Sequence, residues 1–143
     1  MSKFIADAET KALWRKNWLE SIAEFADLPL QQQSWFGSPG FESPYWSFVE
    51  FYCRYFDDYA LNDGYSEFVK NGYLKQAEAD AVASFHAIVA QYKSPNGDDY
   101  DHASILADPK WLHVVQVASI AKADLLTILH DPAELAILRG HEG

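Results

Sequence analysis

The sequence has little of what disulfide-bonded, nucleic-acid-binding and membrane-spanning proteins need. A single cysteine, Cys53, among 143 residues excludes an internal disulfide and a zinc site built on several thiolates. Lys and Arg number 11 against 21 Asp and Glu, and the net charge of −10 disfavours direct binding to nucleic acid or to an anionic membrane. No uncharged apolar run reaches the ~18 residues of a transmembrane helix, and the first residues lack a signal-peptide core. We therefore expect a cytoplasmic protein.

Sequence patterns that carry chemistry are also missing. None of the five histidines forms a His-x-x-x-His pair, and the step from Asp99 to His102 lies in a stretch that predicts a loop capping the next short helix. The acidic stretch after Asn96 lacks Gly at the sixth position and Glu at the twelfth, both of which an EF-hand requires. There is no nucleophile elbow and no glycine-rich phosphate loop. We expect no metal, no cofactor and no catalytic residue, and Cys53 is predicted to be a buried structural thiol.

The patterning that is present predicts helices. Apolar residues recur at steps of three and four along most of the chain, and no segment alternates apolar and polar residues as a half-buried strand does. We expect helices over about 7–28, 43–59, 65–70, 76–92, 103–107, 110–130 and 132–138. Asp108 before Pro109 predicts the start of the helix over 110–130, and Asn71 with Gly72 should end the helix over 65–70. Pro29 should end the first helix, and Gln31–Pro44 should be a connector with at most a short turn at Trp35 and Phe36.

These elements predict an all-α fold: a single globular helical bundle of four long helices plus two or three short ones, with residues 1–143 as one domain. Two helices stand out. The helix over 110–130 is apolar around most of its circumference, which predicts a mostly buried helix at the centre. The helix over 43–59 carries a broad aromatic face, which packs in the core or, in the alternative, lines a pocket or an interface together with Trp46.

The acidic residues fall into two groups that contain no Lys or Arg. Asp57 and Asp58 end the aromatic helix and Asp63 and Glu67 follow it, whereas Asp98, Asp99, Asp101 and Asp108 follow the helix over 76–92. Tyrosines accompany both groups, Tyr100 among them. Such residues either form a solvated surface that keeps the protein soluble or form a docking surface for a basic protein. If both groups lie at one end of the bundle, their fields add.

The composition and the lack of catalytic motifs are similar to those of bacterial immunity proteins, which neutralise cognate toxins. The resemblance implies an acidic inhibitor of a basic protein partner such as a toxin or nuclease, and a phage-encoded inhibitor would have the same features. The candidate partner-binding residues, chosen from the residue pattern alone, are Asp57, Asp58, Asp63, Asp98, Asp99, Asp101, Tyr100, Trp35, Phe36 and Trp46.

Two alternatives stay open: a helical ligand-binding protein or enzyme with a pocket lined by tyrosines and Trp46, and an oligomeric structural protein. The oligomeric state does not follow from the sequence. For the docking surface, charge reversal at Asp98, Asp99 and Asp101 is expected to slow association with the partner and to leave the fold intact.

Overall fold

The computed structural model describes residues 8–36, 48–58, 61 and 64–139. Over these residues the chain forms helices and no strand, which confirms the all-α class. In chain order the elements are α1 (Ala8–Phe25), α2 (Leu28–Phe36), α3 (Phe48–Cys53), the π-helical turn η1 (Arg54–Asp58), α4 (Ser66–Lys70), α5 (Gln76–Gln91), α6 (His102–Ala107), α7 (Pro109–Ile128) and α8 (Pro132–Arg139).

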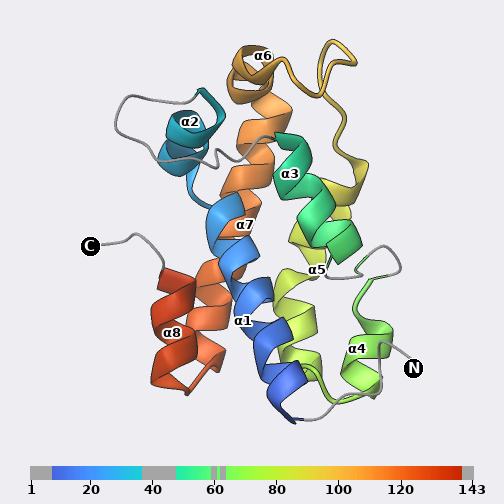
Figure 1. Cartoon of the computed structure of the whole chain (residues 1–143), viewed down its shortest axis with the longest axis vertical. Coiled ribbons are helices and arrows are strands. Elements are labelled where there is room, and N and C mark those ends of the chain that lie inside the picture. Colours follow the sequence, from blue (N-terminus) through green and yellow to red (C-terminus); the bar gives the residue numbers. More distant parts are fainter. Residues whose placement is uncertain (1–7, 37–47, 59–60, 62–63, 140–143) are drawn as a thin grey trace.

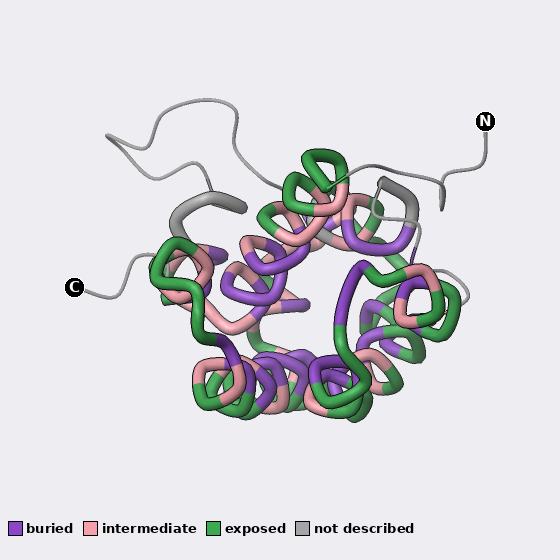
Figure 2. Tube along the Cα trace, turned by 90° about the horizontal axis from the view of Figure 1, so that it is seen from below, coloured by how far each residue is buried: buried purple, intermediate pink, exposed green. Residues whose placement is uncertain are grey.

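Three long helices form the centre of the molecule (Figure 1). Helices α5 and α7 pack against each other in opposite directions, and the short α6 lies at the end where they connect. Helix α1 packs on α7, and α8 packs on α1. Buried residues lie on the sides of the helices that face one another, and exposed residues lie on the outside (Figure 2). The helices thus share one core, which is rich in aromatic rings.

Several helix ends follow the predicted capping chemistry. The Asp108 carboxylate accepts a hydrogen bond from the Lys110 N–H at 3.0 Å, with Pro109 in the first turn of α7. Helix α4 ends at Asn71 and Gly72, and Gly72 has the positive φ of 79° that a helix-ending glycine adopts without strain. These ends are local in sequence, so the residue pattern could predict them.

The prediction for residues 26–36 is wrong. Helix α1 ends at Phe25, and Pro29 lies in the first turn of a second helix, α2, which continues to Phe36. Proline is tolerated there because the first turn has no intrahelical partner for its missing N–H. The Asp27 carboxylate caps α2 by accepting a hydrogen bond from the Leu30 N–H at 3.0 Å. The expected connector therefore begins with a full helix.

Gln31 holds α2 in place from inside the core, where its side chain is fully buried. Its amide group donates to the backbone oxygens of Glu24 and Phe25 at 2.9 and 3.0 Å, and its oxygen accepts from Trp111 Nε1 at 2.9 Å. One side chain thereby joins the end of α1, α2 and the start of α7. Because every polar atom of Gln31 has a partner, its burial avoids the cost of an unsatisfied group.

The aromatic helix is described from Phe48 onward, so its expected start at Ser43 and the residue Trp46 lie outside the described residues. Phe48, Tyr55 and Phe56 are buried, as the core interpretation predicts. Cys53 is exposed, which corrects the prediction of a buried thiol. The reason is that the aromatic rings of α3 and η1 occupy the inward face, and Cys53 falls on the outward one.

The third correction concerns α7, which is buried along one face only. Trp111, Ala118 and Leu125 are buried, whereas Leu112 and Ile120 are 38% and 56% exposed. The helices α5, α1, α6 and α8 contact α7, and they leave its remaining face open. By length and composition α7 is the one described helix apolar enough to cross a bilayer, a test that core helices of soluble proteins also pass.

Candidate functional site

The loop between α5 and α6 carries the second acidic group, and its aspartates are tied to their neighbours. The Asp99 carboxylate accepts from Ser94 Oγ at 2.9 Å, and the Asp98 carboxylate accepts from the Tyr100 N–H at 2.9 Å. Asp101 caps α6 by accepting from the Ser104 N–H at 3.2 Å. These bonds fix the course of the loop, so it is ordered before any partner arrives.

Asp101 is the most constrained of these residues. Its carboxylate also accepts from Ser104 Oγ at 2.8 Å and from Asn96 Nδ2 at 3.0 Å. Hydrogen bonds to the ionised form favour ionisation, so those from Ser104 and Asn96 lower the pKa of Asp101. The expected cap of α6 is confirmed, but Asp101 supplies it, and Asp99 bonds to Ser94 instead.

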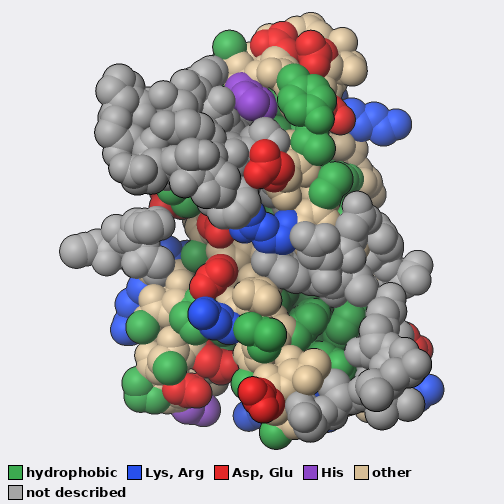
Figure 3. Space-filling view, in the orientation of Figure 1, with side chains coloured by type: hydrophobic (Ala, Val, Ile, Leu, Met, Phe, Trp, Pro, Cys, Tyr) green, Lys and Arg blue, Asp and Glu red, His purple; other side chains and the backbone are tan. Residues whose placement is uncertain are grey.

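Tyr100 projects from the middle of this loop and is 69% exposed, which makes it the most exposed large hydrophobic residue among the described residues. Asp98 and Asp99 beside it are exposed as well. Acidic side chains gather at the end of the molecule where α6 lies (Figure 3). An exposed aromatic ring surrounded by carboxylates and fixed by backbone bonds has the composition of a protein-binding anchor.

Helix α2 lies beside α6 and so belongs to the same end of the molecule. Trp35 and Phe36 form the last two residues of α2, and their side chains lie outside the described residues. The structure therefore places the helix that ends in these two candidates against α6, the helix that follows the acidic loop.

The first acidic group lies elsewhere. Helix α3 and η1 run antiparallel to α5, because the Phe48 ring lies 5.8 Å from the Tyr92 ring while the Phe56 ring lies 5.6 Å from His86. The step of six residues from His86 to Tyr92 spans roughly 9 Å of helix. The backbone of Asp57 and Asp58 follows Phe56, at the end remote from the loop after Tyr92; their side chains, and all of Asp63, lie outside the described residues. The described backbone of Asp57 and Asp58 therefore does not lie at the end of the bundle that carries the acidic loop.

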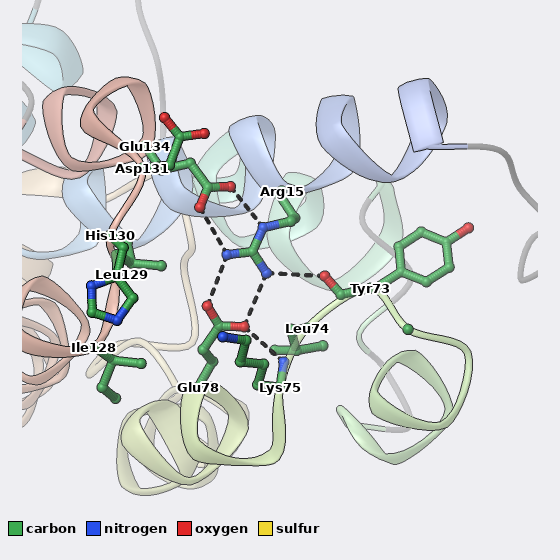
Figure 4. Close-up of a pocket in the computed structure, with 11 residues that line it drawn as sticks. Arg15, Tyr73, Leu74, Lys75, Glu78, Ile128, Leu129, His130, Asp131 and Glu134 are labelled. Atoms are coloured by element: carbon green, nitrogen blue, oxygen red, sulfur yellow. Dashed lines mark hydrogen bonds and ion pairs between the residues drawn. The ribbon is translucent and has the colours of Figure 1, made fainter.

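A second polar site forms around Arg15, where α1 meets the starts of α5 and α8 (Figure 4). The Arg15 guanidinium donates to both carboxylate oxygens of Glu78 at 3.0 and 2.8 Å and to both of Glu134 at 2.7 and 3.0 Å. It also donates to the Tyr73 carbonyl at 3.0 Å. The Arg15 cluster joins α1, the turn before α5 and α8.

Glu78 is the buried member of the Arg15 cluster, with only 3% of its side chain exposed. Burial by itself raises the pKa of a carboxyl group. The hydrogen bonds from Arg15 and from the Lys75 N–H outweigh burial, and the pKa of Glu78 is lowered. Glu78 therefore stays ionised at neutral pH and serves both as the partner of Arg15 and as a cap for α5 through the Lys75 N–H at 2.7 Å.

A cavity of about 450 Å³ opens beside the Arg15 cluster. Its lining comes from the turn before α5, the turn between α7 and α8, and the charged side chains of α1, α5 and α8: Arg15, Gly72, Tyr73, Leu74, Lys75, Glu78, Ile128, Leu129, His130, Asp131 and Glu134. Tyr73 is the one aromatic residue in this lining, so the cavity differs from the tyrosine- and tryptophan-lined pocket of the alternative hypothesis.

The third polar feature is a chain of hydrogen bonds inside the aromatic core. Trp18 Nε1 donates to the Tyr65 hydroxyl at 2.9 Å, the Tyr65 and Tyr55 hydroxyls lie 2.5 Å apart, and the Tyr55 hydroxyl lies 2.8 Å from His86 Nδ1. Burial raises the pKa of both tyrosines and lowers the pKa of His86. The neutral histidine can accept at Nδ1, so each hydroxyl can accept one hydrogen bond and donate one.

An ion pair joins α1 to η1 near this chain. Arg54 donates from one nitrogen to both oxygens of Glu24, at 3.3 and 3.2 Å. Burial, with the nearby charges of Glu20 and Asp27, raises the pKa of Glu24 to about 7 against the opposing effect of Arg54. Burying Glu24 and Arg54 in their ionised forms therefore costs desolvation energy.

Sequence reasoning missed the Arg15 cluster and the chain that ends at His86. Glu78 and Glu134 lie 63 and 119 residues from Arg15, so no local spacing connects them. The one local signal was the position of Glu78 in the first turn of α5, where an acidic residue is a common cap.

Among the described residues, no group of three or more His, Cys, Asp and Glu side chains is arranged to hold a metal ion. No protein-family model, no curated protein and no solved structure matches this chain. Its function is therefore argued from its own residues.

Proposed function

We propose that this protein is a small acidic cytoplasmic binding protein that recognises a basic protein partner and neutralises it, in the manner of an immunity or inhibitor protein. Its partner would be a basic toxin or nuclease. The net charge of −10 supports this proposal, because it favours rapid encounter with a basic surface. The observation that carries it is Tyr100, a 69% exposed ring on a loop whose aspartates are held by hydrogen bonds.

An ordered loop lowers the entropic cost of binding a partner. An anchor residue contributes most when its backbone is already ordered, because little conformational entropy remains to be lost. Tyrosine is a frequent anchor since it offers a large contact area with few rotatable bonds. Asp98 and Asp99 beside Tyr100 supply charge that steers a basic partner towards the ring. The docking surface in this proposal is Asp98, Asp99, Tyr100 and Asp101, with α2 beside it.

Two variants with the same net charge test the proposal. The loop variant Asp98→Asn, Asp99→Asn, Tyr100→Ser changes the proposed surface, and its asparagines keep the side-chain oxygens that accept local hydrogen bonds. The control variant Asp80→Asn, Asp124→Asn removes two charges from exposed positions on α5 and α7 away from the loop. Each protein is immobilised and incubated with an extract of the source organism, and the captured proteins are identified, purified and assayed.

We expect a basic protein that the wild type and the control variant capture and the loop variant does not. The purified partner should lose its activity when the wild type is added, and its affinity for the loop variant should be roughly 30-fold lower, as for the loss of an anchor residue. Added salt should slow its association with the wild type. A captured protein that binds all three proteins equally, or that keeps its activity in the complex, would overturn the proposal.

A further inference from the structure

The Arg15 cluster presents hydrogen-bond acceptors to the cavity and has no free donor on its arginine, while the other cation of the lining, Lys75, lies outside the cluster. An arginine has five N–H donors, and Arg15 directs all five to Glu78, Glu134 and the Tyr73 carbonyl. A carboxylate offers about four acceptor positions, and the bonds from Arg15 use two of those on Glu134. The cluster therefore has nothing to donate to a ligand, and it retains oxygen lone pairs that can accept.

The helix ends around the cavity also favour a ligand that donates hydrogen bonds and carries a positive charge. The positive ends of α5 and α8 are capped by carboxylates of the chain itself, since Glu78 accepts from the Lys75 N–H and Asp131 accepts from the Ala133 N–H at 2.9 Å. The negative end of the 20-residue helix α7 reaches the cavity at Ile128, and its last turn contains no basic side chain. Helix geometry leaves the last carbonyls without donors inside the helix, and a cation is favoured near them.

The charge of the lining points the same way. Arg15 and Lys75 contribute two positive charges, and Glu78, Asp131 and Glu134 contribute three negative ones, which leaves −1 with His130 counted as neutral. The cavity volume of about 450 Å³ lies within the range of small-molecule sites.

The lining also contains apolar side chains. Leu74 and Ile128 line the cavity beside these charged groups (Figure 4). A ligand that fits these surroundings has N–H donors with a positive charge at one end and carbon atoms at the other.

We propose that this cavity binds a small organic ammonium compound. The ammonium group donates to Glu134, to Asp131 and to the carbonyls at the end of α7, and its carbon chain lies against Leu74 and Ile128. This site is separate from the acidic loop and does not depend on the inhibitor function. A metal ion fits the cavity less well, because the described residues hold no group of three or more ligands placed to bind one.

The test is a titration of the whole protein with three probes of equal length: pentylamine, pentan-1-ol and pentanoate. Amide signals in ¹H–¹⁵N NMR spectra report where each probe binds. We expect pentylamine to shift the signals of residues 72–75 and 128–134 in a saturable way, and we expect the alcohol and the carboxylate to leave them unchanged. Tighter binding of pentanoate than of pentylamine would overturn the proposal.

Three variants test whether the affinity for pentylamine follows the charge of the cavity lining. Asp131→Asn keeps an oxygen to cap α8 and removes a negative charge, so pentylamine should bind roughly two- to fivefold more weakly. Lys75→Gln removes a positive charge at an exposed position, so pentylamine should bind more tightly by a similar factor. Asp124→Asn changes a charge outside the lining and should leave the affinity unchanged.

Equal weakening by Asp131→Asn and Asp124→Asn would mean that the amine is attracted only by the overall charge of the protein, which would refute a site. Weaker binding of pentylamine to Lys75→Gln than to the wild type would contradict the charge argument and would refute the proposed site. Thermal unfolding of each variant beside the wild type shows that the fold is kept. Lys75 and Asp124 are exposed, so at least these two variants should remain folded and decide the question.

Discussion

Replacing Tyr55 with Phe removes a single oxygen atom, yet it should lower the free energy of unfolding by about 1–3 kcal/mol. The Tyr55 hydroxyl lies in the middle of the chain from Trp18 through Tyr65 to His86. Pairing the buried Tyr65 hydroxyl proton requires Nδ1 of the neutral His86 ring to accept, and we assign the chain on that basis: Tyr55 donates to His86, Tyr65 donates to Tyr55 and Trp18 donates to Tyr65. Without the Tyr55 oxygen, the Tyr65 hydroxyl and His86 Nδ1 both lose a partner.

The size of this stability loss follows from how deeply Tyr65 and His86 are buried. Tyr65 is only 8% exposed, so its hydroxyl proton has no ready access to water, and a buried donor without a partner costs about 1–3 kcal/mol. His86 is half-buried, so water can replace part of what its ring nitrogen loses. We therefore expect the total loss of unfolding free energy in Tyr55→Phe to stay within this range of about 1–3 kcal/mol.

A matched control lies one turn earlier on the same face. Tyr52→Phe removes a hydroxyl whose bond to the Ala90 carbonyl is exposed and 3.4 Å long, and its expected cost is at most ~0.5 kcal/mol. Both variants are unfolded in urea at about pH 8 and followed by far-UV circular dichroism. If Tyr55→Phe costs no more than Tyr52→Phe, the chain does not contribute to stability, and the assigned direction of its hydrogen bonds has no support.

Three further predictions concern the other buried polar groups. Burial lowers the pKa of His86, so its contribution to stability falls as the pH drops below about 6.5 and the unfolded chain takes up a proton first. The raised pKa of Glu24 acts in the opposite direction in both proteins, so the prediction concerns the difference: in parallel urea titrations the wild type should lose stability relative to His86→Asn as the pH falls below about 6.5. Arg15→Met leaves buried Glu78 without its cation and should cost roughly 3 kcal/mol in the same assay, while a loss below about 1 kcal/mol would show that the Arg15 cluster is not stabilising. Gln31→Leu keeps the size of the side chain and removes three hydrogen bonds, so it should lower the unfolding free energy by at least ~2 kcal/mol and change the near-UV signal of Trp111.

The parts of the fold that the sequence predicted are those with local causes. The expected helix over 76–92 appears as α5, Gln76–Gln91, because its apolar row and its turn residues lie within the helix itself. The start of α7 was predicted by Asp108 and Pro109, whose capping role depends only on neighbours in the sequence. Periodicity also identified the aromatic face of α3 as core.

The parts that the sequence could not predict depend on distant partners. Gln31 stands in a run of three glutamines that is typical of a loop, and its burial makes sense only with Trp111, which lies 80 residues further on. A polar residue expected in a connector is thus buried and joins α2 to the core. In the same way, apolar residues around most of α7 predicted a mostly buried helix, and the helices that actually cover it limit burial to one face.

The acidic loop shows why charge alone is a poor guide to a docking surface. The charge of Asp98, Asp99 and Asp101 could attract a basic partner. Each of these carboxylates also accepts a hydrogen bond that shapes the loop. Charge reversal at all three positions would remove the cap of α6 together with the charge, so the earlier expectation of an intact fold does not extend to Asp101. Asparagine separates the two roles, because it keeps the accepting oxygen and loses the charge. A partner that tolerates asparagine at these positions but not the loss of the Tyr100 ring would recognise the shape of the loop, and one that responds to asparagine would recognise its charge.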